Sequence, residues 1–162
     1  MAQGCDPIIR QAAGAADIAA VGQLFRDYLA ELGEDLSYQG VAEELAGLPG
    51  AYAPPRGALL IARAQEDGQA LGCVALRPLF PPGVCEMKRL HVTPAARGRG
   101  IGRALVAAVL AAARQAGYAE IWLDTLQRLE PALGLYRAMG FRPIAPYNDS
   151  PLPGTLYLGR AL

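Results

Sequence analysis

Residues 97–102, with the sequence RGRGIG, constrain this chain more than any other segment. They lie between an apolar run that ends at Val92 and an apolar pattern of helical period that begins at Ile101. Glycines at alternate positions leave the backbone open, and the first amides of a helix carry unpaired N–H groups and a partial positive charge. Consecutive amides of this kind form a concave nest for phosphate oxygens. The segment predicts an anion site between a strand and a helix, and a glycine-rich turn with solvated arginines is the alternative.

Two common nucleotide-binding motifs do not match this loop. A Rossmann dinucleotide site requires GxGxxG directly after the first strand and an acidic residue about 20 positions later. This loop comes late in the chain, and Pro94 lies between it and the preceding strand. A Walker loop requires GKS or GKT, and the sequence contains neither. The anion would therefore be bound by a different kind of site.

Hydrophobic periodicity divides the rest of the chain into strands and helices. Short apolar runs bounded by turn residues predict strands at residues 7–12, 58–64, 70–79, 84–92, 119–125, 141–144 and 155–162. Apolar residues at three- and four-residue spacing predict helices at residues 15–32, 41–48, 101–117 and 131–139. Asp17 serves as a start signal for the first helix, and Gly33 as its stop. This order of elements predicts an α/β fold in which helices cover a mixed sheet.

Composition narrows the class of protein. The chain has 162 residues, 52% of them apolar, which suits one domain over residues 1–162. Fifteen basic residues balance fifteen acidic ones, so no global charge draws the protein to nucleic acid or to an acidic membrane. Cys5, Cys73 and Cys85 have no paired short spacing, which argues against a disulfide framework and against a metal site. No secretion signal and no apolar stretch of about 18 residues is found, so we expect a cytoplasmic protein that does not act on a membrane.

The glycine loop resembles the coenzyme A loop of the GNAT superfamily of N-acetyltransferases. The family signature is arginine or glutamine, two residues, glycine, one residue, then glycine or alanine, and Arg97, Gly100 and Gly102 match it in register. A second motif of the family lies at its proper distance downstream, and the residues that match it are Ala132, Leu135, Tyr136, Gly140 and Phe141. Individual residues resemble the family over residues 84–144. Outside that range only the order of strands and helices agrees with it.

The resemblance implies a mostly antiparallel sheet of about seven strands with about four helices. It implies direct transfer of the acetyl group of acetyl-coenzyme A (acetyl-CoA) to an amine in a ternary complex. In such enzymes the loop amides hold the pyrophosphate, and the backbone of the preceding strand pairs with the pantetheine arm and diverges from its neighbour. The implied cofactor-binding residues are Leu90, His91, Val92, Arg97, Gly98, Arg99, Gly100, Ile101, Gly102 and Arg103. The sequence departs from the family at Leu129, where an asparagine that reaches the coenzyme is often found.

Glu86 is the candidate general base. Acetyl transfer requires a neutral amine, and Glu86 lies six residues before Val92, the offset of the glutamate that serves as base in several members of the family. A glutamate with its ordinary pKa of about 4.3 is a weak base toward an ammonium, so burial must raise its pKa or a water must relay the proton. The positive charge of Lys88, two residues away, opposes a rise in the pKa of Glu86. A surface ion pair of Glu86 with Lys88 is the alternative.

Strand alternation assigns these side chains to faces. Even offsets predict that Glu86, Lys88, Leu90 and Val92 share one face of their strand and that His91 points to the other. His91, the sole histidine, is therefore expected to be a hydrogen-bonded structural residue. It is the second candidate for the general base, after Glu86.

Tyr136 is the candidate general acid. In the enzymes that the chain resembles, the tyrosine at this motif position points at the coenzyme sulfur and gives its proton to the departing thiolate. Its apolar surroundings, ALGLYRAMGF, allow the alternative that the ring only fills the core. Cys73 and Cys85 lie in apolar strands and are expected to be buried, inert thiols, so a covalent acetyl-cysteine route is not favoured.

The acceptor site is the least constrained part of the sequence. Asp124 at a strand end either binds an acceptor cation or caps the next turn, and Tyr147, Asn148 and Asp149 either border the acceptor pocket or form a surface turn. The expected acceptor is a small-molecule or amino-acid-like primary amine. The alternatives are a coenzyme A-binding module without catalysis and an enzyme that acetylates protein N-termini or lysines. A homodimer is expected only because members of the family often pair.

Overall fold

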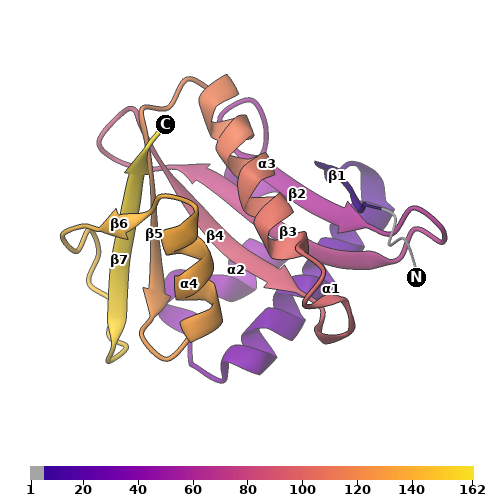
Figure 1. Cartoon of the computed structure of the whole chain (residues 1–162), viewed down its shortest axis with the longest axis horizontal. Coiled ribbons are helices and arrows are strands. Elements are labelled where there is room, and N and C mark those ends of the chain that lie inside the picture. The colour runs from indigo at the N-terminus through magenta and orange to yellow at the C-terminus, as the bar shows by residue number, and fades with distance from the viewer. Residues whose placement is uncertain (1–5) are drawn as a thin grey trace.

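The computed structural model describes residues 6–162, and residues 1–5, including Cys5, lie outside the described part (Figure 1). The strands are β1 (Ile8–Gln11), β2 (Ala58–Arg63), β3 (Ala70–Pro78), β4 (Val84–Val92), β5 (Glu120–Leu126), β6 (Arg142–Pro143) and β7 (Thr155–Ala161). The helices are α1 (Gly14–Leu32), α2 (Val41–Ala46), α3 (Ile101–Gln115) and α4 (Glu130–Ala138), and short 3₁₀ turns span Ser37–Gln39, Gly50–Tyr52 and Pro94–Ala96. Each predicted helix and strand is present, with ends that agree to within two residues.

The strands form one seven-stranded sheet in the order β1-β2-β3-β4-β5-β7-β6. β4 and β5 run parallel, and every other neighbouring pair runs antiparallel. Parallel neighbours need a crossover connection, which α3 supplies here. The predicted α/β fold with a mixed, mostly antiparallel sheet is confirmed.

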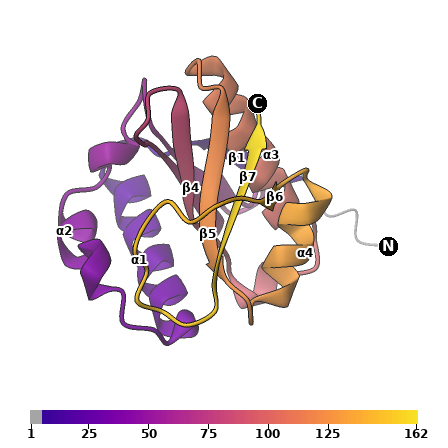
Figure 2. The same cartoon turned by 90° about the vertical axis from the view of Figure 1, so that its left-hand side faces the viewer.

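Helices cover both faces of the sheet. In Figure 2 the sheet is seen from its side, with α1 and α2 on one face and α3 and α4 on the other. Leu105 and Val109 of α3 are buried in a core that includes Met87 of β4. Val21 and Phe25 of α1 are buried in a second core on the opposite face. We call these the α3 face and the α1 face.

A β-bulge at Arg89 changes which side chains of β4 share a face. Arg89 has a φ of 59°, and the pairing of β4 with β3 shifts between Cys73 and Ala75, so that Cys73 is opposite His91 and Ala75 is opposite Lys88. A bulge of this kind inserts one extra residue into a strand and reverses the alternation beyond it.

The predicted faces are therefore wrong beyond Lys88. Leu90 and Val92 pack in the core of the α3 face. His91 lies opposite Cys73, which belongs to the core of the α1 face, and so it shares the face of Glu86 and Lys88. Strict alternation failed because it cannot account for an inserted residue.

β4 and β5 pair over only three residues of each strand. Their parallel register joins Val84, Cys85 and Glu86 to Glu120, Ile121 and Trp122 and ends there. Beyond these pairs the two strands diverge, which confirms the divergence that the family resemblance implies. The gap between them is the centre of the site described next.

Candidate active site

A cavity of about 90 Å³ opens where β4 and β5 diverge. One wall is residues 87–90 of β4 and the other is residues 123–126 of β5, while α1, α4 and the loop 150–155 close its sides. Of the predicted site residues, Leu90, Asp124 and Tyr136 line it. The lining also includes several polar groups that the sequence analysis did not assign to a site, namely Tyr38, Gln39, Arg89, Ser150 and Thr155.

The glycine loop lies at the end of β4, where α3 begins. Gly98 and Gly100 both have φ of 77°, a conformation that L side chains rarely adopt, and a Cβ added at either would meet nothing within 4 Å. The first intrahelical hydrogen bond of α3 runs from Ala104 N–H to Gly100 O, 3.0 Å. The amides of residues 101–103 precede that bond and are free of the helical ladder. The structure therefore has an open group of amides at a helix N-terminus, an arrangement that binds anions.

The start of α3 lies close to α4 at Gly102. A Cβ at Gly102 would lie 3.8 Å from Val92 Cγ2 of β4 and 3.5 Å from Leu135 Cδ2 of α4. Leu135 precedes Tyr136, which lines the cavity. The open amides thus lie near the helix that brings Tyr136 to the cavity.

The arginines of the loop have different surroundings. Arg97 donates to Val92 O at 3.0 Å and to Glu31 of α1 at 2.6 Å, so its charge is paired and it ties the loop to β4 and α1. Arg99 and Arg103 are exposed beside the open amides. These two are therefore the side chains that add positive charge next to the nest.

Tyr136 is a buried residue of α4 with 7% of its surface exposed, and it lines the cavity. Its ring packs edge-on against Phe141, with 5.9 Å between the ring centroids. Burial first, and the charges of Tyr28 and Asp124 next, raise the pKa of Tyr136. The hydroxyl is therefore protonated at neutral pH and can donate its proton within the cavity.

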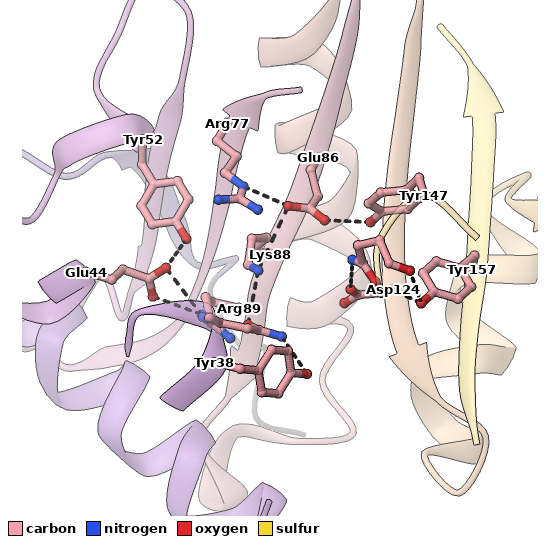
Figure 3. Close-up of polar contacts among 12 residues, drawn as sticks. Tyr38, Glu44, Tyr52, Arg77, Glu86, Lys88, Arg89, Asp124, Tyr147 and Tyr157 are labelled. Atoms are coloured by element: carbon pink, nitrogen blue, oxygen red, sulfur yellow. Dashed lines mark hydrogen bonds and ion pairs between the residues drawn. The ribbon is translucent and has the colours of Figure 1, made fainter. Parts of the chain in front are cut away.

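Glu86 is at the centre of a hydrogen-bond network on the α1 face (Figure 3). Its side chain is 1% exposed; Oε1 accepts from Arg77 Nε at 2.7 Å and Oε2 accepts from the Tyr147 hydroxyl at 2.6 Å. Lys88 Nζ lies 3.9 Å from Oε1. The alternative of a surface ion pair with Lys88 is confirmed as a pairing but wrong about its location, because both side chains are largely buried, and the shorter ion pair of Glu86 is with Arg77. Glu86 does not line the cavity, and Arg77 and Tyr147 each donate a hydrogen bond to one of its carboxylate oxygens.

The loop after β6 completes this side of the site, as Figures 2 and 3 show. Tyr147 lies between the rings of Trp122 and Tyr157, with centroids 5.2 and 5.3 Å away. Burial first, and the Glu86 charge next, raise the pKa of Tyr147. Asn148 Nδ2 donates to Asp124 Oδ2 at 2.8 Å. Tyr147 and Asn148 therefore connect to the predicted site residues.

Asp149 is exposed and does not line the cavity, so the structure does not bring it to the other predicted site residues.

His91 is buried beside α1, with 5% of its surface exposed. Its ring meets Tyr28 edge-on at 6.2 Å, and among residues 6–162 its Nε2 has no hydrogen-bond partner. The expectation of a hydrogen-bonded structural histidine is therefore wrong for this nitrogen. Burial lowers the pKa of His91, which favours the neutral ring.

The two described cysteines are buried, as expected. Burial raises the pKa of the Cys85 thiol to about 12 and raises the pKa of Cys73 as well, so neither is a thiolate at neutral pH. Within residues 6–162 no group of three His, Cys, Asp or Glu side chains is placed to hold a metal ion. No helix in the same range is both long and apolar enough to cross a membrane.

Arg77 and Arg89 are site residues that sequence reasoning missed. Arg77 of β3 pairs with Glu86, and Arg89 donates from Nε to Glu44 of α2 at 3.0 Å. The Tyr52 hydroxyl donates to the same carboxylate at 2.5 Å. Arg77 followed no motif, but the antiparallel hairpin of β3 and β4 places it opposite Glu86, which a register argument could have found.

Comparison with known proteins agrees with this geometry. Residues 20–141 match the model of the acetyltransferase (GNAT) family. The chain belongs to this family. An uncharacterized N-acetyltransferase of Schizosaccharomyces pombe is 44% identical over 142 residues, which make up 88% of this chain and 86% of the relative. The relationship makes the chain an acyltransferase of the GNAT N-acetyltransferase group.

More distant proteins share the sequence or the fold. An uncharacterized N-acetyltransferase of Escherichia coli is 28% identical over 132 residues, covering 79% of this chain and 78% of the relative. The solved structure of an acetyltransferase from Streptococcus agalactiae superposes with a TM-score of 0.78 over 99% of both chains at 20% identity, which shows the common fold.

Proposed function

We propose that this GNAT acetyltransferase uses acetyl-CoA and transfers the acetyl group directly to the primary amine of a small molecule. The observation that carries the proposal is the proximity of two features: open amides at the start of α3 approach α4 at Leu135, and the next residue of α4, Tyr136, lines the cavity. A diphosphate and a thioester at the two ends of a pantetheine arm fit these two features. The cavity of about 90 Å³ favours a small acceptor over a protein chain.

The loop residues fit the cofactor well. The amides of residues 101–103 would hold the diphosphate, with Arg99 and Arg103 beside them. The backbone of residues 90–92 would pair with the extended arm, because β5 leaves this part of β4 without a partner. When bound, acetyl-CoA supplies an activated acetyl group as a thioester.

Two proton transfers then remain for the site residues: one to the departing sulfur and one from the amine. Tyr136 holds a proton at its hydroxyl inside the cavity and would donate it to the departing sulfur. Glu86 is the proposed acceptor of the amine proton. Since Arg77 and Tyr147 occupy its oxygens, we propose that Tyr147 passes its hydroxyl proton to Glu86 Oε2 as it takes up the proton of the amine.

The test is an acetylation assay with a panel of small amines, read by mass spectrometry of the products. The wild type should acetylate at least one amine, and Tyr136→Phe should lower kcat by about 100-fold while acetyl-CoA affinity stays the same. The matched control is Tyr118→Phe, which removes a hydroxyl that donates to Arg56 O at 2.6 Å and should leave kcat unchanged. Absence of any acetylated amine would contradict the proposed function, and full activity of Tyr136→Phe would contradict the role of Tyr136 alone.

A further inference from the structure

The cavity contains a lysine whose charge is only partly balanced. Lys88 Nζ donates to Gln39 Oε1 at 3.2 Å and lies 3.9 Å from Glu86 Oε1, and only 9% of the side chain is exposed. Glu86 already accepts a shorter bond from Arg77. One carboxylate thus serves two cations, which leaves about one positive charge in excess on the β4 wall.

The opposite wall contains a carboxylate with no cation. Asp124 of β5 is half-buried and lines the cavity, and its Oδ2 accepts a hydrogen bond from the neutral Asn148 side chain. Among residues 6–162 no ion pair joins Asp124 to Lys88 or to any other cation. In Figure 3 the two side chains lie on the two sides of the gap between β4 and β5.

The other charges at the cavity are already matched. Arg89 lines the cavity as well, but its guanidinium pairs with Glu44 and lies 6.0 Å from the centre of the Tyr28 ring. Its charge is therefore neutralised within the protein. The remaining polar lining is neutral: Tyr38, Gln39, Thr125, Ser150 and Thr155.

We propose that the acceptor is a zwitterion, a primary amine that also carries a carboxylate, as an amino acid does. The carboxylate would bind Lys88 and the ammonium would bind Asp124, so the ligand would supply the counter-charge that each wall lacks. This inference rests on the proposed function, because it names the class of the amine that the enzyme acetylates.

The charge balance disfavours two other acceptor classes. A diamine would place a second positive group beside Lys88, where no unshared carboxylate is available. A neutral or monocationic amine would leave Lys88, in a largely buried position, with only the carboxylate of Glu86 that it shares with Arg77. A hydrogen bond between charged groups changes affinity by about 10- to 100-fold, so the classes are separable by experiment.

The experiment compares amino acids with their α-amides and with the amines that lack the carboxylate. Binding is measured by calorimetric titration into protein saturated with coenzyme A, and turnover is measured separately with acetyl-CoA. The wild type should bind and acetylate at least one amino acid about 10-fold or more better than its amide. Lys88→Met should reduce the affinity and the turnover of the amino acid to those of its amide. It should change the affinity and the turnover of the amide by less than about 3-fold. Asp124→Asn should weaken both, because both carry the ammonium.

Control variants and separate readouts distinguish failure of the zwitterion inference from failure of the proposed function. Arg114→Met removes an exposed cation at the end of α3 and should preserve the preference, and thermal melting checks that each variant is folded. If amides or simple amines are bound and acetylated as well as amino acids, or if no panel member binds, the zwitterion inference is overturned. If amino acids bind preferentially but no amine is acetylated, the inference stands and the proposed function fails.

Discussion

Arg89 determines which side chains of β4 share a face of the sheet. Its φ of 59° costs about 1 kcal/mol for a residue with a Cβ, and the ion pair with Glu44 and the contact with the Tyr28 ring offset that cost. The inserted residue turns Leu90 and Val92 toward the α3 face, on the side of the glycine loop. Under the proposed function, the same strand would serve the cofactor with its second half and the acceptor with its first.

Removal of the Arg89 counter-ion tests this arrangement. Glu44→Ala leaves a 3%-exposed guanidinium without its carboxylate and should lower the free energy of unfolding by about 3 kcal/mol. Glu44→Gln should cost less, because its amide oxygen still accepts from Arg89. The measurement is denaturant unfolding, with Glu43→Ala, an exposed neighbour on α2, as control. Equal stability of Glu44→Ala and Glu43→Ala would contradict the account.

Gly102 offers a test in which stability and binding change in opposite directions. Its φ is ordinary and an added Cβ meets only normal contacts, so Gly102→Ala should raise the free energy of unfolding by up to about 1 kcal/mol through helix propensity. The same methyl group crowds the amides that would hold the diphosphate, so acetyl-CoA affinity should fall. Gly134→Ala, in α4 with nothing within 4 Å of its Cβ position, is the control. Unchanged acetyl-CoA affinity of Gly102→Ala would remove Gly102 from the cofactor site.

At the scale of the elements, one buried carboxylate holds three of them together. Asp17 of α1 is 3% exposed and accepts from Arg10 of β1, from Arg63 Nη2 of β2 at 2.8 Å and from Ala13 N–H at 3.0 Å. The hydrogen bond from Arg10 first, and that from Ala13 next, lower the pKa of Asp17 from its ordinary 3.8. A lowered folded-state pKa contributes stability above the unfolded pKa and loses it as pH falls below that value.

Asp17→Asn should therefore destabilise the protein by about 2 kcal/mol at pH 7. The difference from wild type should shrink as pH falls below about 4, because the wild-type carboxylate then takes up protons on unfolding. Urea unfolding of both proteins from pH 7 to pH 3 measures it. A stability difference that is independent of pH would show that the Asp17 charge does not contribute as described.

The elements were predictable from the sequence, but the contacts between them were less so. Period-2 and period-3.6 patterns are local, and the glycine loop matched a family motif, so the strands, helices and loop were identified. The bulge at Arg89 was not, because a residue 45 positions away, Glu44, pairs with it. The Tyr147 contact with Glu86 spans 61 positions and depends on where an irregular loop folds back. Such pairings are set by tertiary packing rather than by any local pattern.

At the scale of the whole molecule, the single sheet links the two cores on its faces. Cys73 and Ala75 belong to the core of the α1 face, and Val74 and Leu76 of the same strand belong to that of the α3 face, so neither core can unfold without disturbing β3. We therefore predict that residues 6–162 unfold in one cooperative transition. Differential scanning calorimetry should show one peak, which acetyl-CoA shifts to higher temperature. Two separate transitions would contradict a single domain.

The most direct test of the central claim is calorimetric titration of the wild type with acetyl-CoA and, separately, with acetyl-pantetheine, which lacks the diphosphate and the adenosine attached to it. The account predicts saturable binding of acetyl-CoA with one site per chain, and binding of acetyl-pantetheine that is weaker by about 100-fold, because two charged hydrogen bonds or more at the start of α3 are lost. Absence of acetyl-CoA binding, or equal affinity for the two ligands, would contradict the assignment of the glycine loop as the cofactor site.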